Sequence, residues 1–129
     1  MTTELLKDRK RRLVEPLTYS SSMGVVPVHI GFITDFASIP RVLWPLLPPD
    51  GSYAKAAVIH DYLYTYQAIG GRWITRKQAD QVFLEAMEDS GVGFITRMTV
   101  YAGVRFGGWI AWGDPIPLDD NPTEEDDGE

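Results

Sequence analysis

The sequence contains no cysteine, and this absence removes several kinds of chemistry from consideration. Without a thiol the chain has no disulfide bond, no cysteine nucleophile and no zinc site with cysteine ligands. A cysteine-free chain also suits a reducing compartment, where disulfides do not persist. Chemistry in this protein therefore has to come from other side chains, above all from imidazoles and carboxylates.

The sequence also lacks the long hydrophobic segments of secreted and membrane proteins. The leucine pair at 5–6 is followed at once by the charged run 7–12, so the hydrophobic region of a signal peptide is missing. The most apolar segment, 96–112, contains Arg97 and Arg105 and is shorter than the ~20 predominantly apolar residues of a membrane span. We expect neither secretion through a signal peptide nor a transmembrane segment.

Positive charge is not concentrated enough for a nucleic-acid-binding protein. The net charge is −6, but residues 113–129 hold eight of the 18 acidic residues and no Lys or Arg. Residues 1–112 carry ten acidic and 12 basic side chains, so this part is almost neutral and we expect no nucleic-acid partner. We expect 1–112 to form one globular domain. The acidic, proline-containing tail 113–129 should be disordered unless a partner orders it.

The N-terminal third has the composition of short β-strands. Segments 13–19 and 25–33 are rich in apolar and β-branched residues, and the Ser and Gly residues at 20–24 indicate a turn between them. Pro27 restricts the second segment to an edge strand or a bulged strand. Polar residues and prolines follow at 34–49, which excludes a long helix there. The pattern predicts a small β-hairpin.

Three helices are predicted after the hairpin. The first covers 53–66, with Ser52 as its N-cap, and the second covers 75–89, where Thr and Gln three residues apart form a capping box. The third, 96–112, is apolar nearly all round, which predicts a buried central helix or one that also binds a partner. The expected fold is α+β, with a small N-terminal β-hairpin packed on about three helices.

His60 and Asp61 are adjacent in the first predicted helix and are surrounded by apolar residues. Neighbours i and i+1 point about 100° apart, so these two side chains do not bond each other and can take separate roles. A buried Asp is costly unless it is paired or bound to a metal. Tyr64, three residues after Asp61, is one donor for its carboxylate. The alternative is that the pair is structural.

Two further carboxylates complete a candidate site. Asp80 lies among apolar residues of the second predicted helix, and Asp35 lies in the polar loop before the first. A carboxylate that accepts from an imidazole fixes its tautomer and raises its basicity. Carboxylates together with backbone carbonyls suit Ca²⁺. We hypothesise a His60 base oriented by Asp80, beside a cation held by Asp35 and Asp61. Arg105 is either a buried partner of one of these aspartates or a surface residue.

Three segments together resemble the signature of a bacteriophage and prophage protein family that is known only as a domain of unknown function. The segments occur in the order typical of that family, and the similarity spans about residues 13–110. They read GFITDFASIPR at 31–41, AAVIHDYLY at 56–64 and RKQADQVF at 76–83. The resemblance implies a phage origin. The protein would then be made in the host cytoplasm, and would act there or in the virion.

The same landmarks are more distantly similar to the short bacterial and fungal phospholipase A2 enzymes. Those enzymes have an Asp-x-x-Ser loop, a His-Asp-x-x-Tyr helix and a second helix with an Asp three residues before a Phe. The matching segments here are 35–38, 60–64 and 80–83. This resemblance implies a pair of helices like that of phospholipase A2.

The phospholipase resemblance also implies a role for each site residue. His60 would be the general base for an attacking water, Asp80 would orient it, and Tyr64 would donate to the Asp80 carboxylate. A calcium ion would stabilise the oxyanion as a Lewis acid. The ligands implied for that ion are Asp35, the backbone carbonyl of Phe36, and Asp61.

Two functional classes stay open from the sequence. In the first, the protein is a calcium-dependent hydrolase acting on a phospholipid ester. In the second, it is a non-enzymatic phage component, associated with the tail or capsid or directed at a host protein, in which the His-Asp helix is structural. The third predicted helix and the acidic tail would then bind a protein, and the same helix is a candidate contact between copies of the chain.

Overall fold

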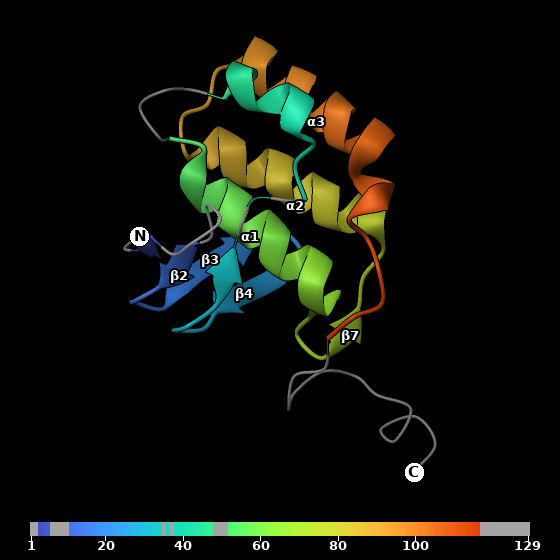
Figure 1. Cartoon of the computed structure of the whole chain (residues 1–129). Helices are drawn as coiled ribbons and strands as arrows, with labels where there is room; N and C mark the ends of the chain where they lie inside the picture. The colour runs from blue at the N-terminus through green and yellow to red at the C-terminus, as the bar shows by residue number, and fades with distance from the viewer. Residues whose placement is uncertain (1–2, 6–10, 35, 37, 48–51, 117–129) are drawn as a thin grey trace.

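The fold is α+β, with strands in the N-terminal part and helices after them, as the sequence predicts (Figure 1). The computed structural model describes residues 3–5, 11–34, 36, 38–47 and 52–116. Within these ranges, every helix is too short or too polar to cross a membrane. The predicted calcium ligand at position 35 and the tail from 117 to 129 lie outside the described residues.

The predicted hairpin is formed by β3 (Leu17–Ser21) and β4 (Gly24–Val28), which pair antiparallel around the turn at 22–23. Its residues alternate between the two faces, because successive side chains of a strand point to opposite sides. Val26 and Val28 of β4 are buried, while Pro27 between them is exposed. One face of the hairpin thus contributes to the core.

A second small sheet brings a loop to the helices. It has the order β1 (Thr3–Leu5), β2 (Arg11–Leu13) and β5 (Ile33–Thr34), all antiparallel. Thr34, the last residue of β5, is buried and donates a hydrogen bond to Asp61 in the first helix. The end of β5 is therefore attached to that helix just before the loop begins.

Three α-helices form the rest of the fold: α1 (Ala54–Tyr66), α2 (Arg76–Asp89) and α3 (Phe94–Gly107). The hairpin and α2 cover α1 from two sides, and α2 lies between α1 and α3 (Figure 1). A short hairpin of β6 (Ala68–Ile69) and β7 (Arg72–Trp73) connects α1 to α2.

The helix ends show which local predictions hold. The capping box before α2 is confirmed. The backbone N–H of Gln78 donates to the Thr75 hydroxyl at 3.1 Å, and the backbone N–H of Thr75 donates to the side-chain oxygen of Gln78 at 2.8 Å. The N-cap predicted for α1 is wrong, because Tyr53 occupies that position and no side chain caps the helix. The C-terminus of α1 is set by Gln67, whose φ of 57° is left-handed and ends the helix.

The prediction of a buried central third helix is wrong, because α1 takes that place. All but three of the 13 residues of α1 are buried, whereas Val100 and Val104 are the only buried residues of the 14 in α3. The outer helix α3 contacts α2, the 3₁₀ helix η2 (Arg41–Leu46) and the following 3₁₀ turn η3 (Gly108–Ile110). Most of its other apolar side chains are exposed, among them Phe94, Ile95, Met98 and Phe106.

Candidate active site between α1 and α2

A His-Asp pair lies in the interface between α1 and α2. Nε2 of His60 lies 2.7 Å from Oδ1 of Asp80, and both side chains have an exposed fraction of 0%. The imidazole is held between the rings of Tyr64 and Phe83, with centroid distances of 4.2 and 4.4 Å. Because an ionised carboxylate only accepts, Nε2 carries the proton, and a neutral His60 has Nδ1 as its acceptor.

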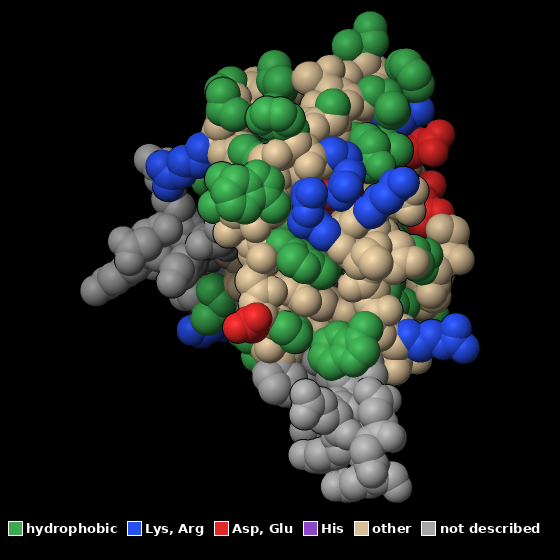
Figure 2. Space-filling model, turned by 90° about the vertical axis from the view of Figure 1, so that its right-hand side faces the viewer, with side chains coloured by type: hydrophobic (Ala, Val, Ile, Leu, Met, Phe, Trp, Pro, Cys, Tyr) green, Lys and Arg blue, Asp and Glu red, His purple; other side chains and the backbone are tan. Residues whose placement is uncertain are grey.

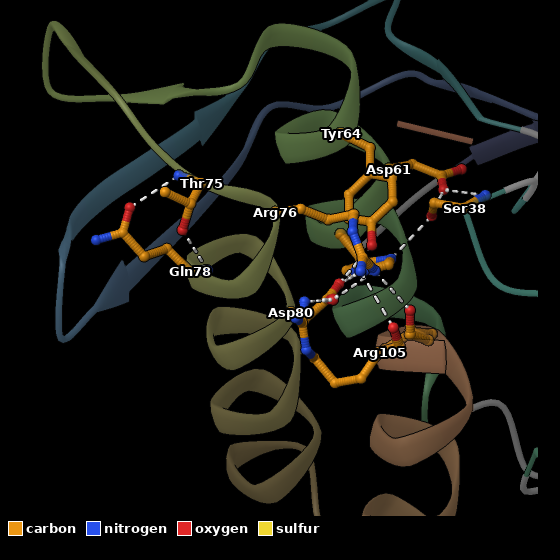
Figure 3. A network of polar contacts seen from close by, with 10 residues as sticks. Ser38, Asp61, Tyr64, Thr75, Arg76, Gln78, Asp80 and Arg105 are labelled. Atoms are coloured by element: carbon orange, nitrogen blue, oxygen red, sulfur yellow. Dashed lines mark hydrogen bonds and ion pairs between the residues drawn. The ribbon is translucent and has the colours of Figure 1, made fainter. Parts of the chain in front are cut away.

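Asp80 accepts hydrogen bonds from three more side chains (Figure 3). The Tyr64 hydroxyl donates to Oδ1 at 2.6 Å, and Arg105 and Arg76 donate to Oδ2 at 2.8 and 3.4 Å. Burial alone would raise the pKa of Asp80. The hydrogen bond and charge of His60, helped by Tyr64 and Arg105, outweigh it and hold this pKa below its ordinary value. Asp80 is therefore the ionised centre of the network.

Arg76 ties this network to α3. Besides Asp80, its guanidinium donates to the backbone carbonyls of Val104 and Arg105 at 3.0 and 3.1 Å. A cation near the C-terminus of a helix offsets the partial negative charge of its carbonyls, so Arg76 stabilises this end of α3 although the Val104 carbonyl also accepts from the Gly108 amide. One arginine thus joins α2, its own helix, to the carboxylate of the site and to the end of α3.

Asp61, the neighbour of His60, faces the loop after β5. Its carboxylate accepts from the Thr34 and Ser38 hydroxyls, and from the backbone N–H groups of Phe36 and Ser38 at 2.9 and 3.2 Å. Burial raises the pKa of Asp61 above its ordinary value, although the hydrogen bonds from Ser38 and Thr34 and the charge of His60 act in the opposite direction. Asp61 therefore holds the loop against α1.

Ser38 joins the two halves of the network. Its Oγ lies 2.9 Å from Nδ1 of His60, and its hydroxyl donates to Oδ1 of Asp61. The order Asp61–Ser38–His60–Asp80 is therefore one continuous chain of hydrogen bonds (Figure 3). Each buried side-chain nitrogen and oxygen of the described residues has a partner, so the polar interior carries no unsatisfied group there.

A pocket of about 130 Å³ opens beside this chain. At roughly 30 Å³ of liquid volume per water molecule, it has room for about four waters or for one small group such as an ester. Ser38 is 4% exposed, and it reaches the pocket wall while His60 lies behind it. The lining residues are Phe32, Ile33, Ser38, Asp61, Tyr64, Thr65 and Ala111.

The predicted calcium ligands do not form a cation site in the described residues. No three side chains among His, Cys, Asp and Glu gather there in a way that would hold a metal. All four lone-pair positions of the Asp61 carboxylate are used by the loop, and the carbonyl of Phe36 accepts from the amide of Ile39 at 3.0 Å. In this arrangement the Asp61 carboxylate has no lone pair left for a calcium ion.

The structure brings the predicted base, its orienting residue and Tyr64 together, and assigns Tyr64 to Asp80 instead of Asp61. Arg105 is the predicted partner of an aspartate, namely Asp80. The catalytic roles stay predictions. Three members of the network had no role in the sequence-based hypothesis, namely the Thr34 and Ser38 hydroxyls and Arg76. The Asp-x-x-Ser spacing marked the right loop, but no local signal places its serine on a histidine 22 residues away.

The chain can also be placed by comparison with known proteins. No match to it was found among curated proteins or among solved structures. A family model does match, over residues 11–104, with the description "Protein of unknown function (DUF1353)". The matched part runs from β2 into α3 and includes Ser38, His60, Asp61, Arg76 and Asp80. Because this match covers well over half of its length, the chain belongs to the uncharacterised family DUF1353.

Proposed function

We propose that this protein is an ester hydrolase that acts on phospholipid, with His60 as the general base. The observation that carries the proposal is the buried pair of His60 and Asp80 at 2.7 Å. It fixes the imidazole tautomer so that Nδ1, the accepting nitrogen, points toward the wall of the pocket. This is the arrangement that general-base catalysis requires, with an oriented imidazole within hydrogen-bond reach of the attacking oxygen.

The surroundings of the pair support the same role. The Tyr64 hydroxyl and the two guanidinium groups keep Asp80 ionised, and an ionised Asp80 stabilises the imidazolium that forms when His60 accepts a proton. The ring contacts with Tyr64 and Phe83 prevent the imidazole from turning away. Such support is what holds a catalytic side chain in its productive geometry.

The outer surface supports a lipid substrate. Side chains of α3, η3 and η2 leave a broad hydrophobic area in solvent, in which Phe106, Ile95 and Ile110 are 88%, 79% and 76% exposed. Contiguous apolar surface of this kind marks a protein or membrane contact. The pocket residue Ala111 directly follows η3, so this apolar surface reaches the pocket. Other large exposed side chains on these three elements are Val42, Leu46, Phe94, Met98 and Trp109.

The charge of this surface favours an anionic lipid. The segments forming η2, α3 and η3 contain Arg41, Arg97 and Arg105 but no Asp or Glu. Two of these arginines, Arg97 and Arg105, are paired with Glu88 and Asp80 of α2, so Arg41 contributes most of the positive charge available to a lipid. Figure 2 shows Lys and Arg side chains near the middle of the face turned to the viewer, with hydrophobic side chains above, below and to the left of them and tan surface between. A helix surface that combines Trp and Phe with arginine suits the boundary between headgroups and acyl chains. A pocket of about 130 Å³ holds the ester alone, so the acyl chains would lie along the apolar surface.

The phage origin implied by the sequence motifs belongs to the same proposal. A phospholipid hydrolase encoded by a phage would act on the membrane of the host, either from the cytoplasm or from the virion. The phospholipase resemblance also implies that the reaction requires calcium. This requirement is a separate proposal, because the Asp61 carboxylate is already hydrogen-bonded to the loop.

A second function is favoured by a different observation. His60 and Asp80 are fully buried, and the polar side chains around them are all satisfied, as they would be in a purely structural network. In that case the protein is a non-enzymatic phage component, and the apolar surface of α3 binds a virion or host protein. The two functions differ in whether His60 chemistry is needed.

The test is fatty-acid release from phosphatidylglycerol vesicles by the wild type, His60→Gln and His29→Gln. His29 is the other histidine of the chain and packs on aromatic rings outside the network, so it is the matched control. We expect His60→Gln to lower the rate by at least about 100-fold, the usual contribution of a general base, and His29→Gln to leave it unchanged. Equal rates for the three proteins, or no release by the folded wild type, would reject the hydrolase. Repeating the assay with EDTA and with added calcium tests the metal requirement separately.

A further inference from the structure

We propose that Ser38 is the nucleophile of this site and that the reaction proceeds through an acyl-enzyme. The inference rests on the proposed hydrolase function and changes its attacking group, because the phospholipase resemblance implies a water on the imidazole. In the structure the hydrogen-bond position of Nδ1 is taken by Ser38 Oγ at 2.9 Å. A water that displaced this hydroxyl would have to break the contact that connects the loop to His60.

The three side chains have the relationship of a nucleophile, a base and an orienting acid. The Ser38 hydroxyl lies on one ring nitrogen of His60 and the Asp80 carboxylate lies on the other, at 2.9 and 2.7 Å. This linear order is the signature by which an activated hydroxyl is recognised, whatever its position in the sequence. Ser38 is also the member of the three that lines the pocket, so it is the one that a substrate reaches first.

The loop around Ser38 is held in an unusual conformation. Phe36 has a φ of 60°, which is left-handed and rare for a residue with a large side chain. Its amide and that of Ser38 both donate to Asp61, which therefore fixes the backbone on either side of the bend. Strained backbone that is retained by several hydrogen bonds is typical of functional loops. Asp61 is a positioning residue here, because it acts through Ser38.

The proposed reaction balances without a further reactant. In the structure the single hydroxyl proton of Ser38 is donated to Asp61, so the hydroxyl first turns that proton to Nδ1 of His60. Oγ then attacks the ester carbonyl carbon while the proton moves to Nδ1. The bond between that carbon and the alcohol oxygen then breaks, and the leaving oxygen takes the proton from Nδ1. Water attacks the acyl-enzyme in the same way, its proton passing through Nδ1 to Ser38 Oγ. The products are the alcohol, the fatty acid and the free enzyme.

The direct test is covalent labelling with an alkyl fluorophosphonate, followed by intact mass and peptide mapping of the wild type. We expect one adduct per chain, on Ser38, with loss of fluoride. Labelling should disappear in Ser38→Ala and slow strongly in His60→Gln. Ser90→Ala, which changes a serine at the end of α2 far along the chain from the site, should label normally. Hydrolysis should fall by about a thousand-fold or more in Ser38→Ala.

The outcomes separate this inference from the proposed function. Ester hydrolysis by a wild type that takes no label, or an adduct on another residue, overturns Ser38 as nucleophile and leaves the hydrolase standing with water as the attacking group. Absence of both hydrolysis and labelling in the folded wild type overturns both. Mapping of the wild-type adduct needs no variant, so it decides the matter even if Ser38→Ala does not fold.

Discussion

In this protein, ionisable side chains are buried on one side of α2, and large apolar side chains are exposed on the other side. On the α1 side, buried side chains include an imidazole and two carboxylates, His60, Asp80 and Asp61. On the other side, α3 exposes Phe, Ile and Met side chains to solvent. Buried ionisable groups need partners to offset their desolvation, and exposed apolar groups gain nothing from water. The first region is stabilised by its polar partners, and the second leaves apolar surface in contact with water.

This difference suggests a division of labour. In the interior, the polar contacts hold the Ser38 hydroxyl and the His60 imidazole beside a pocket. In the outer helix α3, two valines pack in the core, and most of the other apolar side chains are exposed and available to a lipid surface or a protein partner. Changes in the interior should therefore damage both folding and chemistry. Changes on the outer face should affect neither, except where a lipid surface or partner is present.

The largest expected effect is on the interior carboxylate. Asp80→Ala would leave His60, Tyr64 and two arginines without their shared acceptor. We expect it to lower the free energy of unfolding by about 3–5 kcal/mol, the usual consequence of breaking a buried ion pair from one side. Glu88→Ala on the same helix removes an exposed carboxylate that lies 3.5 Å from Arg97, and should cost at most about 1 kcal/mol.

Urea unfolding followed by circular dichroism measures both variants. Similar losses for the two would mean that the Asp80 network contributes no more than a surface ion pair, against the contacts described above.

The two faces of α3 give the next largest difference. Val104→Ala removes buried methyl groups, and at about 0.8 kcal/mol per buried carbon plus a cavity contribution it should cost about 2 kcal/mol. Phe106→Ala removes a larger side chain that is 88% exposed, and should change stability by no more than about 0.5 kcal/mol. Thermal unfolding at low protein concentration compares them. A strongly destabilised Phe106→Ala would show that the outer face is already covered, for instance by a second copy of the chain.

The pH dependence of stability should have opposite signs at the two interior carboxylates. The pKa of Asp80 is lowered, so its contribution is present above the ordinary value of 3.8 and is lost as the pH falls through the folded-state pKa. The pKa of Asp61 is raised, so its contribution is present below 3.8 and is lost as the pH rises through the folded-state pKa.

Urea unfolding from about pH 3 to about pH 7 measures this difference with Asp80→Asn and Asp61→Asn. The advantage of the wild type over Asp80→Asn should shrink toward low pH, and its advantage over Asp61→Asn should shrink toward high pH. Parallel pH profiles for the two variants would contradict the assigned directions.

Local signals account for the parts of the structure that the sequence predicts well. The hairpin follows from strand composition around a turn, and the start of α2 follows from a Thr and a Gln three residues apart. The contacts of Asp80 with His60 and Tyr64 follow from spacing that resembles another family. Each of these features depends on residues within one or two elements.

The parts that the sequence did not predict depend on how the elements are arranged. Both α1 and α3 are apolar nearly all round, and only their places in the fold decide that α1 is central and α3 is outermost. Ser38 reaches His60 because the pairing of β5 with β2 and the four bonds of Asp61 deliver its loop to α1. Arg76 looked like part of a helix start, and its contacts with Asp80 and with the carbonyls of α3 need the third helix in place.

The most direct measurement of the central claim compares two phosphatidylglycerols with the same headgroup and ester bond. One has long acyl chains and is presented as vesicles, and the other has short acyl chains and is presented as monomers below its critical micelle concentration. The wild type should hydrolyse both. His60→Gln should lose both activities, whereas Phe106→Ser on the exposed face should lose most of the vesicle activity and keep the monomer activity. Hydrolysis of neither form by the folded wild type, or equal losses on both forms in Phe106→Ser, would contradict a buried site that serves an exposed lipid-binding face.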